Sequence, residues 1–211
     1  MTNVLLLGAG GLAREVLSAD LDGHRVVGIL DDDPGLRGEL VGGVRVLGGL
    51  AHAAEYDADL VVCVGSGKAR RAIVQRLDEL GVRHDRYATV ADRAVRIPQS
   101  CTVGSGSVLL AGAVLTADAQ LGDHVVLMPN VTITHDDVVA DYATLAAGVS
   151  LGGGVRIGEA AYLGMNSSVR QQQTVGREAV VGMGSVVVAD VPDGEVWAGV
   201  PARPLRIEEE S

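Results

Sequence analysis

The sequence predicts two successive architectures in one chain, an α/β domain followed by a parallel β-helix built from six-residue repeats. Two observations carry this prediction. Up to about Val95, apolar strand-like runs alternate with helix-like segments, which is typical of a parallel α/β sheet. From Ile97 to Val187, each of sixteen consecutive positions spaced six residues apart is Ile, Leu or Val. A fixed six-residue period is a known signature of a β-helix.

The first half divides into short predicted strands and two predicted helices. We expect strands at residues 3–7, 25–30 and 59–65, with a last one at 85–90. One helix should follow the glycine-rich segment GAGGLA (8–13), and another should span 68–80. The second helix has an amphipathic pattern with apolar positions Ala72, Ile73, Leu77 and Leu80. Residues 1–95 should therefore form one α/β domain.

Each six-residue unit of the second half predicts one flat face of the β-helix. The aliphatic residue should point inward and stack on the residue eighteen positions away, because three units close one coil. The residue four positions later is small or apolar, except at Asp137 and Gln173. Glycine often follows the aliphatic residue, where we expect it to relieve the turn. Residues 96–192 should form about five coils, followed by a C-terminal loop and tail (193–211) whose end, RIEEES, should be frayed.

Composition excludes several classes of protein. The formal net charge of −10 disfavours non-specific binding to nucleic acid or anionic lipid, because both would repel an acidic surface. Cys63 and Cys101 form no CxxC pair, so neither a disulfide framework nor a zinc knuckle is expected. The longest apolar runs are far shorter than a membrane span, and no signal sequence precedes the first strand. We expect a cytoplasmic protein without membrane insertion.

The GAGGLA segment follows a strand and opens a helix, which is the context in which a glycine-rich turn binds phosphate at a helix N-terminus. Asp31 ends the second strand, where a dinucleotide-binding fold places a ribose-binding acid. Taken alone, these residues suggest an NAD-dependent oxidoreductase, or a structural turn that an aspartate caps. The α/β part is too short for the two halves of a full dinucleotide fold, which argues against the oxidoreductase.

The segment THDDV (134–138) holds the candidate base. His135 is third in the unit that starts at Ile133, so it should face outward. A nearby carboxylate stabilises the imidazolium, which raises the pKa and makes a better base near neutral pH. Adjacent strand residues point to opposite sides, so Asp136 can reach His135 only if the chain bends there, as at a coil corner. We expect Asp137 to be a corner carboxylate that caps backbone N–H groups. The alternative is that His135 is an ordinary surface residue.

A metal site is not expected. Gamma-class carbonic anhydrases share the β-helix but need three zinc-binding histidines. The repeat region of this chain contains His124 and His135, which do not supply that set.

Four segments together point to a family. They are VLLLGAGGLAREVL (4–17), GILDDDP (28–34), VGSGKARR (64–71) and VWAGVPARPL (196–205). In this order, and over nearly the whole chain, the sequence resembles the hexapeptide-repeat sugar acyltransferases, which include bacterial nucleotide-amino-sugar N-acetyltransferases and sialic acid O-acetyltransferase-like proteins. The resemblance implies a left-handed β-helix, a Rossmann-like N-terminal domain that binds a nucleotide-linked sugar, and a homotrimer with acetyl-CoA between neighbouring subunits.

The resemblance also assigns roles to particular residues. It implies that His135 is the general base, that Asp136 supports it, and that the N–H of Gly153 stabilises the oxyanion. It places acetyl-CoA against Thr144, Gly153, Met165, Met183 and Arg203. It places the nucleotide-linked sugar against Gly10, Gly11, Leu12, Asp31, Asp32, Gly65 and Lys68.

Three positions depart from the family pattern. Relatives carry His at the positions of Leu12 and Thr144, and Asn at the position of Met128. These departures leave the acyl-transfer residues in place but leave open which sugar is used. The sequence therefore predicts an acetyl-CoA-dependent N-acetyltransferase of a nucleotide-linked amino sugar, acting by direct transfer. The alternatives are O-acetylation of a sugar hydroxyl and a non-catalytic trimeric scaffold.

Overall fold

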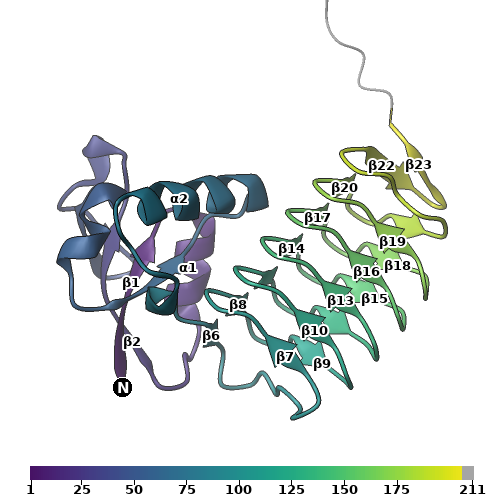
Figure 1. Cartoon of the computed structure of the whole chain (residues 1–211), viewed down its shortest axis with the longest axis horizontal. Helices are drawn as coiled ribbons and strands as arrows, with labels where there is room; N and C mark the ends of the chain where they lie inside the picture. The colour runs from purple at the N-terminus through teal and green to yellow at the C-terminus, as the bar shows by residue number, and fades with distance from the viewer. Residues whose placement is uncertain (206–211) are drawn as a thin grey trace, which may run out of the picture.

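The computed structural model describes residues 1–205. An α/β domain at the N-terminus packs against the side of a β-helix that forms most of the remaining described residues (Figure 1). The segment 206–211, for which a frayed end is predicted, lies outside the described residues. Within residues 1–205, no helix combines the length and the apolar character that a membrane crossing requires.

The N-terminal domain is a layered α/β unit whose sheet has the strand order β3-β4-β2-β1-β5. Its elements are β1 (Thr2–Leu7), α1 (Gly11–Ser18), β2 (His24–Leu30), β3 (Leu40–Val41), β4 (Val44–Gly48), β5 (Asp59–Val62) and α2 (Gly67–Glu79), with 3-10 turns at Pro34–Leu36, Leu50–Glu55 and His84–Arg86. The pairs β1–β2, β1–β5 and β2–β4 are parallel, whereas β3 and β4 form an antiparallel pair. The predicted alternation of strands and helices is confirmed for β1, α1, β2, β5 and α2.

Two predictions for this domain were wrong in detail. The range predicted as a strand at 85–90 contains the end of the 3-10 turn His84–Arg86 and an isolated bridge between Tyr87 and Leu60. Only its last residue is in a strand, β6 (Val90–Ala91), which pairs with the β-helix strand β8. The apolar pattern of α2 also misled: Leu77 is buried, but Ala72 and Leu80 are exposed, while Arg70 is fully buried. The reason is that α2 packs against the β-helix as well as against its own domain.

The β-helix consists of three sheets of very short strands. The strands are β7 (Thr102–Val103), β8 (Val108–Leu109), β9 (Val114–Leu115), β10 (Gln120–Leu121), β11 (Val126–Leu127), β12 (Thr132–Ile133), β13 (Val138–Val139), β14 (Thr144–Leu145), β15 (Ser150–Leu151), β16 (Arg156–Ile157), β17 (Tyr162–Leu163), β18 (Ser168–Val169), β19 (Thr174–Val175), β20 (Val180–Val181), β21 (Val186–Val187), β22 (Val196–Gly199) and β23 (Ala202–Pro204). Their orders are β19-β16-β13-β10-β7, β23-β22-β20-β17-β14-β11-β8-β6 and β21-β18-β15-β12-β9. The hexapeptide period and these parallel sheets fit a left-handed β-helix.

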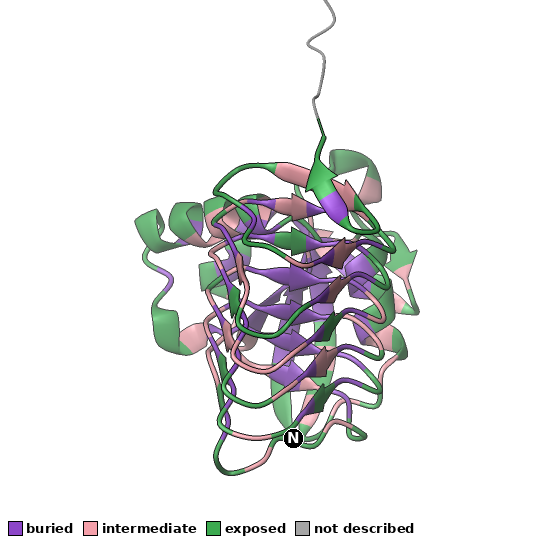
Figure 2. Ribbon diagram, turned by 90° about the vertical axis from the view of Figure 1, so that its right-hand side faces the viewer, coloured by how far each residue is buried: buried purple, intermediate pink, exposed green. Residues whose placement is uncertain are grey.

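The eighteen-residue stacking predicted from the repeat is confirmed. For example, Val126 pairs with Thr144, and Thr144 pairs with Tyr162. The aliphatic positions from Leu109 to Val187 form one buried column in the interior, which Figure 2 shows as buried strands stacked on one another. Each fully buried Leu or Val stabilises the fold by roughly 1.5–3 kcal/mol. Ile97 is an exception, because it is 41% exposed and lies before the first complete coil.

The glycines that follow the aliphatic residues serve a different purpose from the one predicted. A Cβ at Gly152 would lie 2.7 Å from the backbone N of Gln171, and a Cβ at Gly164 would lie 2.6 Å from the backbone N of Met183. Glycine at these positions therefore lets successive coils approach closely. The turn itself is made two residues after the glycine position, where the backbone has a positive φ, as at Asp118, Asn130 and Asp136. Asp and Asn adopt this left-handed region more readily than most residues.

The two parts share a hydrophobic core. Outward side chains of the β-helix strands nearest the N-terminal domain, Val108, Leu110 and Val126, pack with Val4 and Leu6 of β1 in one cluster. Because apolar contacts continue across the junction, the position of the α/β domain on the β-helix is set by packing as well as by the connecting chain.

Candidate active site

His135 lies at a corner of the β-helix, in the turn between β12 and β13. Its side chain is 67% exposed, as the six-residue register predicts. The backbone of Asp136 has a φ of +62°, so the chain turns sharply between His135 and the next strand. This is the bend that Asp136 needs in order to reach His135, as expected from the sequence.

The corner brings the imidazole and the carboxylate together. His135 Nδ1 lies 2.8 Å from Asp136 Oδ2, and this hydrogen bond raises the pKa of His135 above its ordinary value. The partner of Nδ1 fixes the tautomer, since Nδ1–H donates to the carboxylate and Nε2 is left as the acceptor. The pair can therefore take up a proton at Nε2.

Asp137 has the structural role that the sequence predicted. Its buried carboxylate accepts hydrogen bonds from the N–H of Thr134 (2.7 Å) and from the N–H of Val155 (2.8 Å), one coil further on. Burial raises the pKa of Asp137, although the two N–H donors counteract this. Asp137 thus ties the His135 corner to the coil that carries Gly153.

Gly153 lies directly against the imidazole. A Cβ added at Gly153 would lie too close to both Cε1 and Nε2 of His135, so the ring can keep this position only because residue 153 is a glycine. Within residues 1–205 the N–H of Gly153 has no hydrogen-bond acceptor, whereas the N–H groups of Gly152 and Gly154 donate to Val169 and His135 carbonyls. A basic nitrogen and a free N–H donor are therefore adjacent.

The residues predicted to contact acetyl-CoA do not lie together in one chain. Met165 and Met183 are exposed and stack on successive coils at another corner, where the N–H of Gly184 donates to the carbonyl of Met165. Arg203 is exposed on β23. Thr144 is only 3% exposed, and its hydroxyl is held inside the junction between the two parts of the chain.

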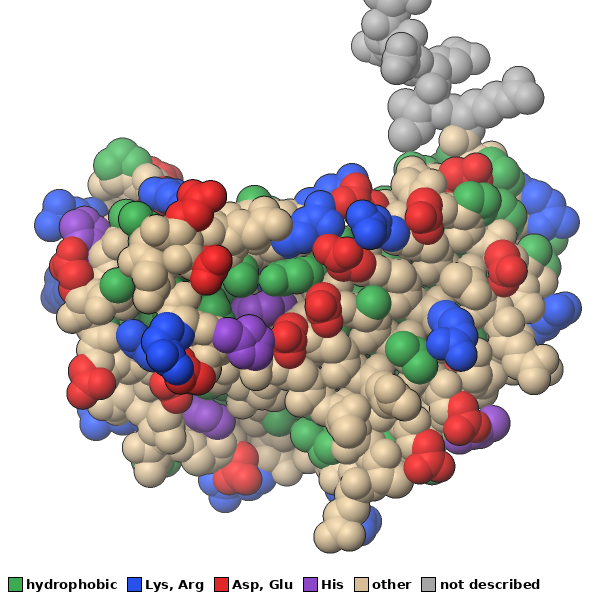
Figure 3. All heavy atoms as spheres, viewed as in Figure 1, with side chains coloured by type: hydrophobic (Ala, Val, Ile, Leu, Met, Phe, Trp, Pro, Cys, Tyr) green, Lys and Arg blue, Asp and Glu red, His purple; other side chains and the backbone are tan. Residues whose placement is uncertain are grey.

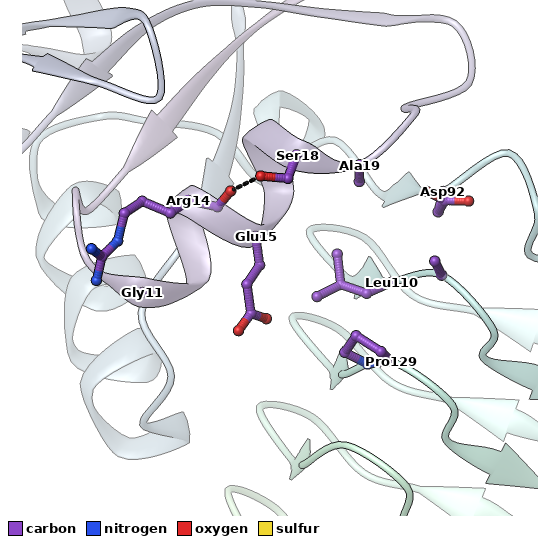
Figure 4. Close-up of a pocket in the computed structure, with 9 residues that line it drawn as sticks. Gly11, Arg14, Glu15, Ser18, Ala19, Asp92, Leu110 and Pro129 are labelled. Carbon is purple, nitrogen blue, oxygen red and sulfur yellow. Dashed lines mark hydrogen bonds between the residues drawn. The ribbon is translucent and has the colours of Figure 1, made fainter.

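The residues predicted to bind the nucleotide-linked sugar lie at the carboxyl edge of the N-terminal sheet. Gly11 lines a cleft of about 480 Å³ between α1 and the β-helix, with Leu110 and Pro129 on its opposite wall (Figure 4). A Cβ at Gly10 or Gly11 would meet no atom within 4 Å, and Gly10 has a φ of −77°, which any residue adopts. The chain's own packing therefore gives no reason for glycine at these two positions.

The other predicted sugar-binding residues have contacts within the chain. Asp31 accepts hydrogen bonds from the N–H of Ala9 (2.7 Å) and of Asp33 (2.9 Å). It thus caps the glycine-rich turn, as expected if this segment were a structural turn. Asp32 accepts from the N–H of Leu50 and pairs with Arg76 at 2.6 Å. Leu12 is buried in the core.

A second cleft, of about 320 Å³, lies at the N-terminus of α2. Gly65 and Lys68 line it together with Tyr162, Glu178 and Val180 of the β-helix. The Lys68 ammonium pairs with Glu178 at 2.8 Å. Gly65 and Lys68 therefore both lie at the junction between the two parts of the chain, and the Lys68 side chain already forms an ion pair there.

The structure brings the predicted residues together in groups rather than in one pocket. His135, Asp136 and Gly153 form one group, and the glycine-rich loop forms another. Neither of the two clefts described above contains His135.

Sequence reasoning missed Arg70, which is fully buried at the junction, and Arg71, which pairs with Glu159 and Glu178. On the face seen in Figure 3, Lys and Arg side chains lie beside Asp and Glu at this junction. In residues 1–205, no group of three or more His, Cys, Asp or Glu side chains is arranged to hold a metal ion.

Comparison with known proteins shows which family this chain belongs to. A family model described as the PglD N-terminal domain matches residues 3–77, and a model described as the hexapeptide repeat of succinyl-transferase matches residues 154–189. The acetyltransferase domain of PglB from Neisseria gonorrhoeae is 32% identical, with 97% of this chain and 100% of that chain covered and a TM-score of 0.87. The chain belongs to the hexapeptide-repeat sugar N-acetyltransferase family. It is therefore an acyltransferase, as the sequence predicts.

Other similar structures include two that contain bound ligands. The PglB domain has been solved in complex with acetyl coenzyme A. PerB from Caulobacter crescentus, solved with CoA and GDP-perosamine, is 30% identical over 98% of both chains, with a TM-score of 0.87. WeeI from Acinetobacter baumannii is 27% identical, with 97% of this chain and 100% of that chain covered and a TM-score of 0.83. No curated protein sequence matches the chain.

The Asp136 carboxylate should set the lower end of the pH profile. A histidine base works when neutral, so if His135 is the base, kcat/KM should rise as the pH increases through the pKa of His135 in the free enzyme. Asp136 raises that pKa, so Asp136→Asn should move the acidic limb of the kcat/KM profile to lower pH. Asp118→Asn removes the same charge at the same corner one coil away and serves as the control. An acidic limb that stays in place in Asp136→Asn, or moves equally in both variants, would contradict the pairing.

Proposed function

We propose that this protein transfers the acetyl group of acetyl-CoA to the amino group of a nucleotide-linked sugar. Two relatives support the two substrates, since PerB has been solved with CoA and the nucleotide-linked sugar GDP-perosamine, and the PglB domain with the acyl donor acetyl coenzyme A. The observation that carries the proposal is the geometry at one corner, where an imidazole polarised by Asp136 lies directly over Gly153.

The proposed reaction is direct acyl transfer with His135 as general base. The amino nitrogen attacks the thioester carbonyl carbon, and Nε2 of His135 accepts the proton that the nitrogen loses. The carbon–sulfur bond then breaks, and CoA leaves as the thiol after taking up a proton. A positioned base of this kind contributes about 10²–10⁴-fold to the rate. Asp136 supports it because the hydrogen bond to Nδ1 stabilises the imidazolium.

Gly153 is proposed to stabilise the charge that develops on the thioester oxygen. Attack at the carbonyl converts that oxygen into an oxyanion, which needs a donor already in position. The N–H of Gly153 has no acceptor within residues 1–205 and lies at the same corner as Nε2. One residue thus supports both functions, by leaving room for the ring and by offering its N–H.

The N-terminal domain (1–95) is proposed to be Rossmann-like and to hold the nucleotide part of the sugar. In open parallel sheets, ligands bind at the carboxyl ends of the strands where neighbouring connections diverge. Here β1 lies between β2 and β5, and the loops after β1 and β5 carry the open glycines Gly10, Gly11 and Gly65. The N-terminus of α1 supplies N–H groups to a phosphate. The proposed sugar contacts of Asp31, Asp32 and Lys68 would add to this, whereas the side chain of Leu12 is buried in the core and does not reach the cleft.

The β-helix (96–192) and the C-terminal loop (193–211) are proposed to bind acetyl-CoA in a homotrimer. Within one chain, His135 lies at one corner and Met165 and Met183 lie at another, with sheet β21-β18-β15-β12-β9 between them. A neighbouring copy that presents its Met165 corner to this His135 would complete the acyl-CoA site. We expect the enzyme to act in the cytoplasm, because both cysteines are free and buried.

The test is a screen of nucleotide-linked sugars with acetyl-CoA, in which free thiol release is followed. UDP-, dTDP- and GDP-linked amino sugars are each paired with the hydroxyl sugar of the same configuration. We expect thiol release with at least one amino sugar, together with a mass gain of one acetyl group on nitrogen. Transfer to the hydroxyl sugars alone would favour O-acetylation, and the absence of transfer from acetyl-CoA to every sugar would contradict the proposal.

A further inference from the structure

Arg70 is a fully buried guanidinium that joins the two parts of the chain. Nε donates to the carbonyl of His124 (3.0 Å), and Nη2 donates to the carbonyls of Tyr142 (2.6 Å) and Ala143 (3.0 Å) of the β-helix. Nη1 donates to the carbonyls of Val64 (2.9 Å) and Gly65 (3.0 Å), which follow β5 in the N-terminal domain. One side chain thus holds backbone atoms of both parts.

The environment of this charge is unusual. No carboxylate pairs with Arg70 in residues 1–205, so carbonyl and hydroxyl oxygens alone compensate its charge. Burial lowers the pKa of Arg70 to about 10. Burying a charge is costly unless every donor is satisfied, and an apolar residue of similar volume would serve packing at a lower cost. The directional hydrogen bonds of Arg70 therefore point to a role in geometry.

The loop that Arg70 holds is adjacent to the glycine-rich loop. A Cβ at Gly8 would lie 2.9 Å from Val64 Cγ2 and 3.1 Å from the carbonyl O of Cys63, so the chain after β1 rests on the chain after β5. On the other side, Gly67 at the start of α2 touches the β-helix so closely that a Cβ would collide with the carbonyl of Tyr142. The Val64–Gly65 loop is thus clamped between the glycine-rich loop and one coil of the β-helix.

Thr144 reinforces the same contact. Its hydroxyl donates to the carbonyl of Gly65 (2.9 Å) and accepts from Nη1 of Arg70 (3.0 Å). Because the side chain is buried and its hydroxyl is used in both directions, it has no free group to offer to acetyl-CoA. Thr144, one of the three positions at which this chain departs from the family pattern, thus faces the α/β domain.

We propose that Arg70 and Thr144 are positioning residues that fix the Val64–Gly65 loop, and with it the bound nucleotide-linked sugar, relative to the acyl-transfer corner. The inference rests on the proposed function. The sugar is held by one part of the chain and the reacting groups by the other, so a shift of about 1 Å at the joint costs on the order of 10²-fold in rate.

The test compares variants on the same helix and at the same joint. Arg70→Lys keeps the charge but loses the planar set of donors that reaches both parts. Thr144→Val keeps the shape and removes the hydroxyl. Arg71→Gln is the control, because Arg71 also bridges α2 to the β-helix, through Glu159 and Glu178, but touches neither Val64 nor Gly65. Circular dichroism establishes that each variant is folded before KM and kcat are measured for both substrates.

We expect Arg70→Lys to raise the KM for the nucleotide-linked amino sugar about tenfold or more and to lower kcat, with the KM for acetyl-CoA changed by less than about twofold. Thr144→Val should act in the same direction with a smaller effect, and it remains informative if Arg70→Lys does not fold. Arg71→Gln should leave both KM values near those of the wild type.

An equal change in both KM values, no change in either, or a rise confined to acetyl-CoA in Thr144→Val would overturn the positioning role. A wild-type protein that transfers no acetyl group to any sugar in the screen would instead contradict the proposed function itself. The two failures are therefore distinguishable.

Discussion

Replacing His135 with alanine is expected to lower kcat by about 10²–10⁴-fold, the range that a positioned general base contributes. The imidazole is exposed and packs against no core residue, so its removal should leave the β-helix intact. The Kd of CoA, measured by calorimetry, should stay near the wild-type value, because the proposed role is in proton transfer and not in holding the donor. Steady-state thiol release measures the rate.

His84→Ala is a matched control for this variant. His84 is also an exposed histidine with an aspartate partner, and its Nε2 lies 2.9 Å from Asp123 Oδ2. It differs in that it lies before the repeat region and contacts no glycine of the acyl-transfer corner. Turnover of His135→Ala close to that of His84→Ala would remove His135 from the mechanism.

Replacing Gly153 with alanine should have the second-largest effect. The added Cβ would lie too close to both Cε1 and Nε2 of His135, so the ring must shift away from its position at the corner. Gly153 is not among the residues with positive φ, so the backbone itself tolerates alanine, and the N–H of residue 153 is retained. We expect a loss of about 10²-fold in kcat, the order that a displacement of about 1 Å causes, with little change in the thermal midpoint.

A double variant separates the steric effect from other effects. In the His135→Ala background the ring is absent, so Gly153→Ala should cost little further activity. Residues that act as a unit give such non-additive losses. If the two losses simply multiply, Gly153 acts independently of the ring, and the steric account of this corner is wrong.

The repeat and the outward direction of His135 could be predicted because they depend on local order. The interior column from Leu109 to Val187 and the corner at Asp136 both follow from a six-residue register. The role of Asp137 was also predicted, because a carboxylate at an inward position can be tolerated only with backbone donors. The exposure of Ile97 was not predicted, because it depends on where the first complete coil begins.

The joint between the two parts could not be predicted, because its contacts are distant in sequence. Arg70 lies in a helical run of charged residues, which indicates a solvated face, yet its partners include Thr144, 74 residues away. Thr144 itself was predicted to contact acetyl-CoA from the family pattern, and only the three-dimensional arrangement shows that its hydroxyl binds Gly65. The hairpin β3–β4 was missed for a local reason, since the glycines around it weaken the strand pattern.

In the proposed reaction, the amino group of a nucleotide-linked sugar reacts at the corner formed by His135 and Gly153. The most direct test is a crystal structure of the enzyme with CoA and the amino sugar that the screen identifies. The account predicts the amino nitrogen within about 3 Å of Nε2 of His135, as a general base requires, the CoA sulfur beside Gly153, and the diphosphate at the glycine-rich loop. An amino nitrogen bound away from every copy of His135 would contradict it.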